Sequence, residues 1–522
     1  MLRTRAAVRP TPAGIGRTAA SAAAVAVLAA PVLYLVVRAS QSDPSASLAL
    51  VLRPRTAELL GTSLALALAV ALAAGALGVG QAVALARLRL PAGRALLVAA
   101  ALPLAMPSYI AAFGWLGAVP SMHGFWAAWL QLTLVCAPYV TLPVHAALRS
   151  APPGLEIAAR SLGRGPASAF LQTTWPLVRP AATAGALLCG LYALGDFGVV
   201  SLMRVETLST GIARAMGAGF DRSYAALLGL VLVGAAAALL ALEQAVRRAA
   251  PPLRSRGARA VRVAAGAWTA PALLLVLVTP IGAILVPVAV LLARAADAAS
   301  VRALDASRLL EATGTSLALA AAAAVLALLL AAPIAVGAAR RPTRLARGLE
   351  AAATLAHGMP GIVVGLSFVF LTLALVPWAY QSAFALIAAY AVLGAPRAVG
   401  AVRASIARVP ERFEHLARTL GRGPGAAALA TTWRLALPGV SVAALLAAVA
   451  ALKELPATLL LRPTGVDTLA TSLWARTDVS EYAAAAPFAL VLVACAAVPA
   501  MLVLAVSGAR DRVEHEAERS GA

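Results

Sequence analysis

Three charged side chains interrupt apolar stretches of this sequence and are its first candidates for chemistry. Asp196 lies in an apolar run near 180–203, and Lys453 and Glu454 lie side by side in a run near 438–461. A charge at the centre of a bilayer costs roughly 2.5–3.5 kcal/mol, so such groups usually face a cavity or a partner. Two interpretations are open: these residues line a transport pathway or its gate, or they lie near the membrane interface and only hold helices together.

The residue pattern gives no support to an enzyme acting within the membrane. Such an enzyme needs a nucleophile beside a base, or a set of metal ligands, and neither the five histidines nor the three cysteines have such a spacing. The Gly-rich phosphate-binding pattern ending in Gly-Lys is also absent, because the one lysine, Lys453, follows a leucine. The sequence therefore predicts no bound cofactor or metal, and energy must come from a partner or an ion gradient.

The elements that must position the three charges are predicted to be membrane helices. The 522 residues are 61% hydrophobic and only 12% charged, which leaves too little polar surface for a soluble protein of this length. Runs of about 20 apolar residues are long enough to cross the hydrocarbon core as helices. We therefore predict an all-α polytopic membrane protein. About twelve runs lie near 18–37, 59–85, 95–118, 124–148, 180–203, 223–246, 263–293, 311–339, 348–376, 381–402, 438–461 and 483–507.

The net charge of +22 does not indicate nucleic-acid binding, because the positions of the basic residues follow the apolar runs. The basic residues lie in short loops at the ends of apolar runs, as topology signals do. If the N-terminus is inside, the inner loops carry 31 Lys and Arg residues and the outer loops carry 11. This distribution predicts that both termini lie in the cytoplasm.

The chain is a tandem repeat. The stretch Glu156–Pro180 recurs 258 positions later as Glu414–Pro438 with more than half of its residues identical, and GTSLALA at 61–67 recurs at 314–320. Each repeat holds an even number of runs, so the two repeats have the same orientation, with a pathway possible between them. The predicted divisions are a first repeat at 1–246, a basic linker at 247–262, a second repeat at 263–508 and a polar tail at 509–522.

A hydrophilic loop occurs at matching places in both repeats, at 152–180 and 410–438, and it is predicted to be cytoplasmic. Its first part has good helix formers with an acidic first turn, and glycines then end the helix. We expect a short helix on the membrane surface that docks a partner, followed by a second short amphipathic segment at 167–175. The docking residues are predicted to be Glu156, Ala159, Arg160, Gly163 and Gly165 in the first repeat, and Glu414, Ala417, Arg418, Gly421 and Gly423 in the second.

These loops resemble the EAA loop of ATP-binding-cassette importer permeases, in which EAA is followed by three residues and a glycine. Gly163 and Gly421 fall on the family glycine, but Ile157 and His415 replace the family glutamate, with Glu156 and Glu414 one residue earlier. The resemblance implies a type I importer permease fold in the inner membrane of a bacterium. It also implies two copies of a cytoplasmic ATPase, which use Mg-ATP, and an extracytoplasmic solute-binding protein.

The stretches at 192–203 and 452–474 narrow this resemblance to fused permeases of the ferric-iron type, which are similar to permeases for thiamine and for aminoethylphosphonate-like anions. The predicted function is therefore the pore-forming subunit of a binding-protein-dependent importer, with ferric iron as the expected substrate and thiamine or a phosphonate as alternatives. A gradient-driven secondary transporter with twelve helices also fits two parallel halves, but it does not need two such loops.

Overall fold

The structure, a computed structural model, describes residues 12–41, 44–217, 222–249, 262–297, 305–479, 481–499 and 501. It is a bundle of long helices, and the only strands among the described residues are the two-residue β1 (Leu88–Arg89) and β2 (Val263–Ala264), which pair in parallel. Most of the predicted basic linker and the whole predicted polar tail lie outside the described residues.

The first repeat contains α1 (Pro12–Ser40), α2 (Pro44–Val51), α3 (Pro54–Arg87), α4 (Gly93–Ala101), η1 (Leu102–Ala105), α5 (Ser108–Ala118), α6 (Phe125–Cys136), α7 (Pro138–Ser150), α8 (Pro153–Ser161), α9 (Pro166–Ala169), η2 (Phe170–Thr174), α10 (Trp175–Gly195), α11 (Gly198–Leu202), α12 (Leu208–Gly217) and α13 (Arg222–Ala249). The second repeat contains η3 (Gly266–Trp268), α14 (Thr269–Pro280), η4 (Ile281–Leu285), α15 (Val286–Ala295), α17 (Ala306–Arg340), α18 (Arg344–Leu355), η5 (Ala356–Gly358), α19 (Gly361–Leu375), η6 (Pro377–Ala379), α20 (Ala383–Ala407), α21 (Arg412–Thr419), α22 (Pro424–Ala428), η7 (Leu429–Trp433), α23 (Arg434–Leu452), α24 (Pro456–Leu461), α25 (Leu469–Asp478) and a last span, Tyr482–Pro499.

Ten helices of the described residues are long and apolar enough to cross a membrane, which confirms the predicted polytopic helical class. The other two predicted runs are broken. In the first repeat, α4 with η1 meets α5 at an angle of 95° at Met106-Pro107, and in the second repeat Met359-Pro360 separates α18 and η5 from α19. Proline has no N–H for the helix ladder and disfavours a helical conformation in the residue before it, so both repeats break at the same sequence feature.

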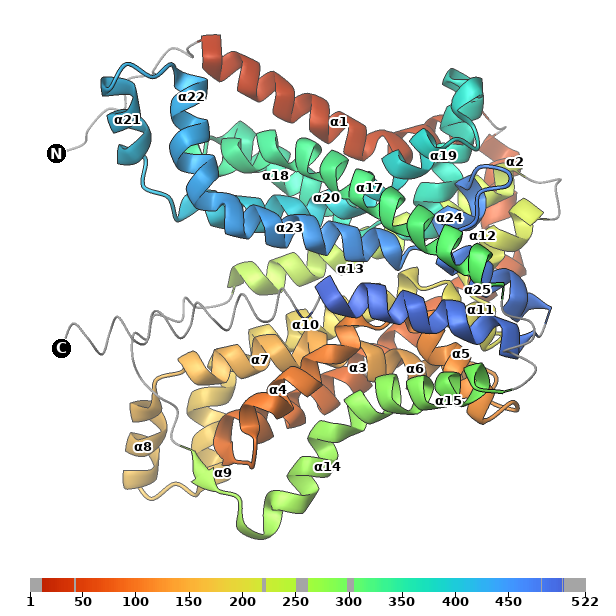
Figure 1. The fold of residues 1–522 in the computed structure, drawn as a ribbon. Helices are drawn as coiled ribbons and strands as arrows, with labels where there is room; N and C mark the ends of the chain where they lie inside the picture. Colours follow the sequence, from red (N-terminus) through yellow and green to blue (C-terminus); the bar gives the residue numbers. More distant parts are fainter. Residues whose placement is uncertain are drawn as a thin grey trace.

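The first helix of each repeat packs on the other repeat. The helix α1 packs along α17, α18 and α19, while α14 and α15 pack on α4 and α5. Figure 1 shows α1 lying on the side of the green and blue helices of the second repeat, and α14 and α15 lying beside the orange helices of the first. A Cβ on Gly114 of α5 would lie 2.5 Å from the backbone of Pro287 in α15, so a glycine allows this close crossing. The two repeats are therefore interleaved in space.

The repeated GTSLALA motif has a matching structural role in both halves. Ser63 Oγ in α3 accepts a hydrogen bond of 2.9 Å from the backbone N–H of Leu208 at the start of α12, and Ser316 Oγ in α17 accepts one of 2.9 Å from Leu469 at the start of α25. Both serines are buried. Each hydroxyl thus satisfies a helix-terminal donor that has no partner within its own helix.

We expect Ser63→Ala and Ser316→Ala each to lower the free energy of unfolding by about 1–3 kcal/mol, because each change leaves a buried N–H without its partner. Thermal unfolding of the purified protein in detergent measures the effect. Ser161→Ala, at an exposed hydroxyl, is the matched control. Equal melting temperatures for all three variants would contradict the role of the motif.

Candidate functional site

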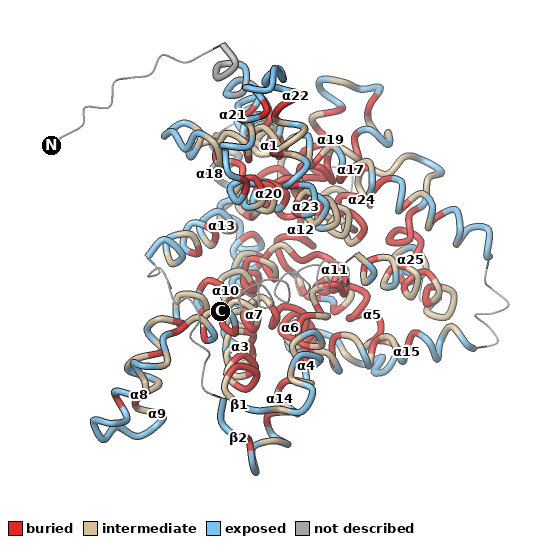
Figure 2. The backbone as a smooth tube through the Cα atoms, turned by 60° about the vertical axis from the view of Figure 1, so that its left-hand side comes forward, coloured by how far each residue is buried: buried red, intermediate tan, exposed pale blue. Residues whose placement is uncertain are grey.

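A cavity of about 500 Å³ lies in the middle of the molecule, between the two repeats. The structure brings all three predicted pathway residues to its wall: Asp196 from the first repeat, and Lys453 and Glu454 from the second. The two helix breaks also reach it, since Pro107 and Pro360 line the cavity as well. Figure 2 shows that buried residues gather in the middle of the bundle, whereas α8 and α9 at its edge are largely exposed.

Asp196 lies between α10 and α11, where the predicted span at 180–203 is interrupted. Its Oδ1 accepts a hydrogen bond of 2.8 Å from the N–H of Val199, and its Oδ2 accepts one of 2.6 Å from Ser108 Oγ. The carboxylate therefore caps α11 and ties it to α5, which begins at the helix break. Asp196 therefore lines the cavity and also joins helices, and its role in the pathway stays a prediction.

Glu454 occupies the corresponding place in the second repeat. Its Oε1 accepts a hydrogen bond of 3.1 Å from the N–H of Ala457 at the start of α24. Where the first repeat has Ser108, the second has Gly361, and a Cβ on Gly361 would overlap the Glu454 carboxylate. The longer glutamate thus needs the space that the glycine leaves. Beside it, Lys453 Nζ donates to the backbone oxygen of Leu104 at 2.8 Å, and this contact joins the two repeats.

The two repeats place residues of different charge on the cavity wall at equivalent positions of the sequence. Tyr139 of the first repeat corresponds, at the offset of 258, to Arg397 of the second, and both line the cavity together with Tyr109 and Tyr192. Tyr139 and Tyr192 pack against each other with ring centroids 6.1 Å apart. Sequence reasoning missed Arg397 because it counted this residue as a topology arginine, although it lies within α20 rather than in a loop.

The two predicted docking helices, α8 and α21, form with the same local geometry. Gly163 and Gly421 both have φ of +82°, in the left-handed region that favours glycine. In each copy the glycine N–H bonds to the carbonyl three residues back, and the N–H of the next residue bonds to the carbonyl five residues back. This is the Schellman motif, so the predicted helix ends are built by the predicted glycines.

Each docking helix is held by one small buried residue, Ala159 in α8 and Ala417 in α21. The leucine that ends each helix is strongly exposed: Leu162 is 81% exposed and Leu420 is 82% exposed. Arg160 and Arg418 are exposed on the same helices. Gly165 and Gly423 have extended backbone conformations and precede α9 and α22. Figure 1 shows α8 and α21 at the same end of the bundle, with α2 and α12 at the opposite end.

The predicted docking glutamate of the first repeat faces inward. Glu156 Oε2 lies 2.7 Å from Arg87 Nη2 and accepts a hydrogen bond of 3.0 Å from Thr174 Oγ1. Arg87 is the last residue of α3, so the contact ties α8 to a long membrane helix and to the π-helical turn η2. Sequence reasoning missed Arg87. The signal that could have found it is its recurrence as Arg340, at the offset of 253 that also relates the two GTSLALA motifs.

The second repeat builds the same connection less directly. Arg340 Nη2 donates to Thr432 Oγ1 at 3.1 Å, and Thr432 donates to Glu414 Oε2 at 3.2 Å. Arg340 Nη1 also donates to the backbone oxygen of Val409 at 2.7 Å, while Glu414 pairs with Arg418 on its own helix at 2.8 Å. Both docking helices are therefore fastened to the ends of α3 and α17.

The predicted second segment at 167–175 leads directly into the next span, as expected. It forms α9 and the π-helical turn η2, which continue into α10 as one helical stretch, Pro166–Gly195. The second repeat has the same continuation through η7. The helix continues because its backbone bonds run without a gap from Ala169 N–H to the carbonyl of Gly165 and on through the π-helical turn η2 into α10. The docking loop is correspondingly shorter than predicted.

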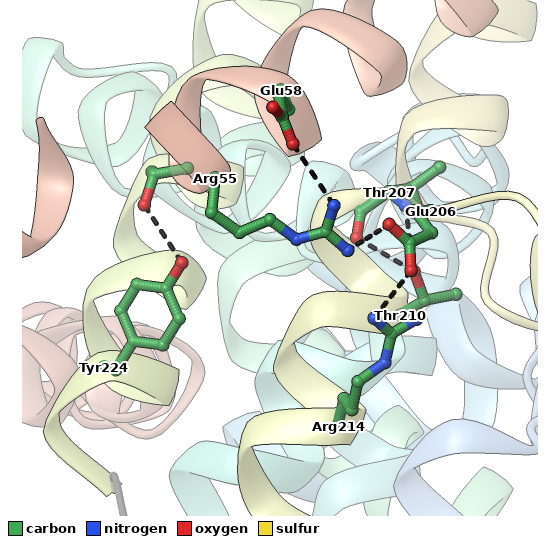
Figure 3. Close-up of polar contacts among 8 residues, drawn as sticks. Arg55, Glu58, Glu206, Thr207, Thr210, Arg214 and Tyr224 are labelled. Carbon is green, nitrogen blue, oxygen red and sulfur yellow. Dashed lines mark hydrogen bonds and ion pairs between the residues drawn. The ribbon is translucent and has the colours of Figure 1, made fainter. Parts of the chain in front are cut away.

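A polar network lies at the opposite end of the bundle. Figure 3 shows Arg55 of α3 and Arg214 of α12 both contacting Glu206, with Arg55 also contacting Glu58. The two arginines lower the pKa of the Glu206 carboxyl, with Arg214 the larger cause. Because these side chains are exposed, their contribution to stability is small, and their effect is to fix the loop between α11 and α12.

Comparison with known proteins agrees with this architecture. Residues 327–512 match the family model described as binding-protein-dependent transport system inner membrane component. The chain is 32% identical over 490 residues to the Fe(3+)-transport system permease protein FbpB 2 of Haemophilus influenzae, covering 91% of this chain and 95% of that protein. It is 28% identical over 159 residues to a probable molybdenum ABC transporter permease protein of Haloferax volcanii, covering 28% of this chain and 58% of that protein.

The match to the relative from Haemophilus influenzae covers 91% of this chain, so it extends over both repeats. Such a match over almost the whole of two chains reflects one shared architecture. The chain therefore belongs to the family of binding-protein-dependent transport system inner membrane components, the permeases of ATP-binding-cassette importers.

Proposed function

We propose that this chain forms the translocation pathway of an ATP-driven importer for ferric iron, and that a separate ATPase drives it through α8 and α21. The observation that supports ferric iron as the substrate is the similarity to an Fe(3+)-transport permease over nearly the full length of both proteins. Thiamine and organophosphonates are the alternative substrates, because related fused permeases carry them.

The geometry of α8 and α21 supports the coupling role. Two equivalent helices at the same end of the bundle each present a leucine that is more than four-fifths exposed, followed by a glycine turn. An exposed apolar side chain on a short helix suits insertion into a cleft of a partner. Two such helices related by the repeat fit a partner that is itself a dimer, as two ATPase subunits would be.

The position of the central cavity supports the pathway role. It lies between the repeats, and its wall contains the helix breaks and the caps of α11 and α24. Closing of the two ATPases would move α8 and α21, and through the Arg87 and Arg340 contacts would tilt α3 and α17. The two repeats would then alternate between outward-open and inward-open states, with an extracytoplasmic binding protein delivering the substrate.

Uptake of labelled ferric iron tests the substrate. Cells with and without this gene are compared under iron limitation, in a strain that lacks redundant importers, with unlabelled thiamine and aminoethylphosphonate as competitors. Loss of iron uptake on deletion, restored by the wild-type gene, is the expected result. Unchanged iron uptake would exclude ferric iron and would move the proposed substrate to thiamine or an organophosphonate. Sensitivity to vanadate separates an ATP-driven importer from a gradient-driven transporter.

Gly421→Val tests the docking helix. A β-branched residue in the left-handed region is strained by about 1–2 kcal/mol, and no atom lies within 4 Å of the added Cβ, so the protein should still insert and fold. We expect uptake to fall at least about fivefold because the end of the helix is displaced, with unchanged amounts of protein in the membrane. Gly425→Val, at an open position without positive φ, is the control. Normal uptake by Gly421→Val would contradict the docking role.

A further inference from the structure

Two aromatic contacts join the two repeats beside the central cavity. Phe197 of the first repeat packs on Trp474 of α25, with ring centroids 5.5 Å apart. Phe113 of α5 stacks on Tyr482, the first residue of the last span, with ring centroids 5.6 Å apart. Both phenylalanines are buried, whereas their two partners are half-buried. We call these four residues the aromatic clasp.

The aromatic clasp lies on the side of the cavity that is away from the docking helices. Phe197 lines the cavity and also contacts Trp474, so its ring stands between the cavity and α25. Figure 1 shows α5, α11 and α25 towards the end of the bundle that is opposite α8 and α21. If α8 and α21 meet a cytoplasmic ATPase, as proposed above, the clasp covers the cavity on its outer side.

The hydrogen bond between Ser108 and Asp196 fixes the two phenylalanines relative to each other. Phe197 directly follows Asp196 in the chain. Phe113 lies in α5, whose first residue is Ser108. The bond of 2.6 Å between the hydroxyl and the carboxylate therefore ties together the two elements that carry the rings. The two partner rings also come from one short segment, 474–482, so the clasp joins one unit of each repeat.

The matching positions at the opposite seam between the repeats carry different side chains. Three of the four counterparts are aliphatic: Leu366 for Phe113, Leu455 for Phe197 and Ala213 for Trp474. Both leucines are completely buried in the main apolar core. The fourth counterpart, Tyr224, hydrogen-bonds to Thr56 of its own repeat at 3.0 Å. One seam thus has ring contacts near the surface, and the other continues the core.

We propose that the aromatic clasp is the outer closure of the cavity, and that cargo enters along this seam and not along the aliphatic one. The proposal rests on the proposed function, which supplies the cargo and the outer side. Contact between rings excludes water and is favourable without a hydrogen bond, so it can part and form again. In the state that receives cargo, α25 and the last span move away from Phe113 and Phe197, while the aliphatic seam stays packed.

Cross-linking tests the clasp in the complete transporter, with its ATPase and binding protein, in proteoliposomes. In a chain whose three cysteines are replaced by alanine, Phe197→Cys and Trp474→Cys are joined by a short bis-methanethiosulfonate reagent. We expect the cross-link to abolish ⁵⁵Fe uptake and a reducing agent to restore it. Trp126→Cys with Trp129→Cys, whose ring centroids lie 5.7 Å apart within α6, is the matched control. Normal uptake by the cross-linked clasp would overturn the inference and leave the proposed function standing.

Trp474→Ala installs the residue of the first repeat and tests the clasp without cargo. Opening of the outer side and closing of the ATPases belong to one movement, so weakening the closed state shifts the population towards hydrolysis. We expect ATP hydrolysis without binding protein or cargo to rise at least about fivefold. Trp474→Phe, which keeps a ring, and Trp126→Ala, at an exposed tryptophan, should stay near the wild-type rate. Unchanged hydrolysis by assembled Trp474→Ala would overturn the inference. This readout does not depend on iron, so it separates a failure of the clasp from a wrong substrate.

Discussion

Arg87→Ala is expected to reduce ATP-dependent uptake at least about tenfold, while the transporter still assembles and hydrolyses ATP. Arg87 joins α3 to the docking helix α8 through Glu156, and both side chains are only about one-fifth exposed. A hydrogen bond between charged groups contributes about 1.5–3 kcal/mol, which is as large as a typical coupling free energy between two sites. Without this contact, a movement of α8 would no longer be passed fully to the membrane helix.

The comparison needs three further variants. Arg89→Ala removes an exposed arginine two residues further along and should leave uptake unchanged. Glu156→Ala should match Arg87→Ala, and the double variant should be no worse than either single variant, because residues that act as one unit are not additive. Uptake and ATP hydrolysis are measured in the same proteoliposomes. If uptake and hydrolysis fell in parallel, the contact would serve assembly or stability instead of coupling.

The docking helices illustrate what the sequence could and could not predict. The repeated glycines indicated where each helix ends, because only a left-handed residue closes the observed turn. The resemblance to the EAA loop did not predict that the Glu156 side chain points inward. One residue turns a helix by about 100°, so the family position, Ile157, is 58% exposed while Glu156 faces Arg87. Arg87 itself lies 69 residues away from Glu156 in sequence, and only folding brings the two together.

The exchange of first helices could not be predicted from the sequence. The helices α1 and α14 are apolar over most of their lengths, and the polar contact that joins α1 to α17, from Ser21 Oγ to the backbone oxygen of Pro333, spans 312 positions of sequence. The two repeats resemble each other in sequence. The hydrophobic pattern of each first helix is therefore compatible with packing on its own repeat or on the other one. The broken spans, in contrast, were marked by prolines and by the charged residues Asp196 and Glu454, which the structure places at helix starts.

Gly361→Ser is expected to reduce uptake at least about tenfold, although the substitution copies the first repeat, which has Ser108 at this position. A side chain on Gly361 would displace the Glu454 carboxylate, and the cap on α24 that it provides is worth about 0.5–2 kcal/mol. The helix α24 borders the cavity through Pro456. Displacing its first turn therefore changes the wall of the proposed pathway and not only the stability of the fold.

The double variant Gly361→Ser with Glu454→Asp should restore most of the uptake, since it rebuilds the serine–aspartate pair that Ser108 and Asp196 form in the first repeat. Gly348→Ser, where an added Cβ meets nothing within 4 Å, is the control. Uptake is normalised to the amount of transporter in the membrane, because this separates the two roles of the acidic residues. If uptake per transporter stayed constant while the amount of transporter fell, Glu454 would only hold helices together. If uptake per transporter fell in the single variant and recovered in the double variant, the cap of α24 would belong to the transport pathway.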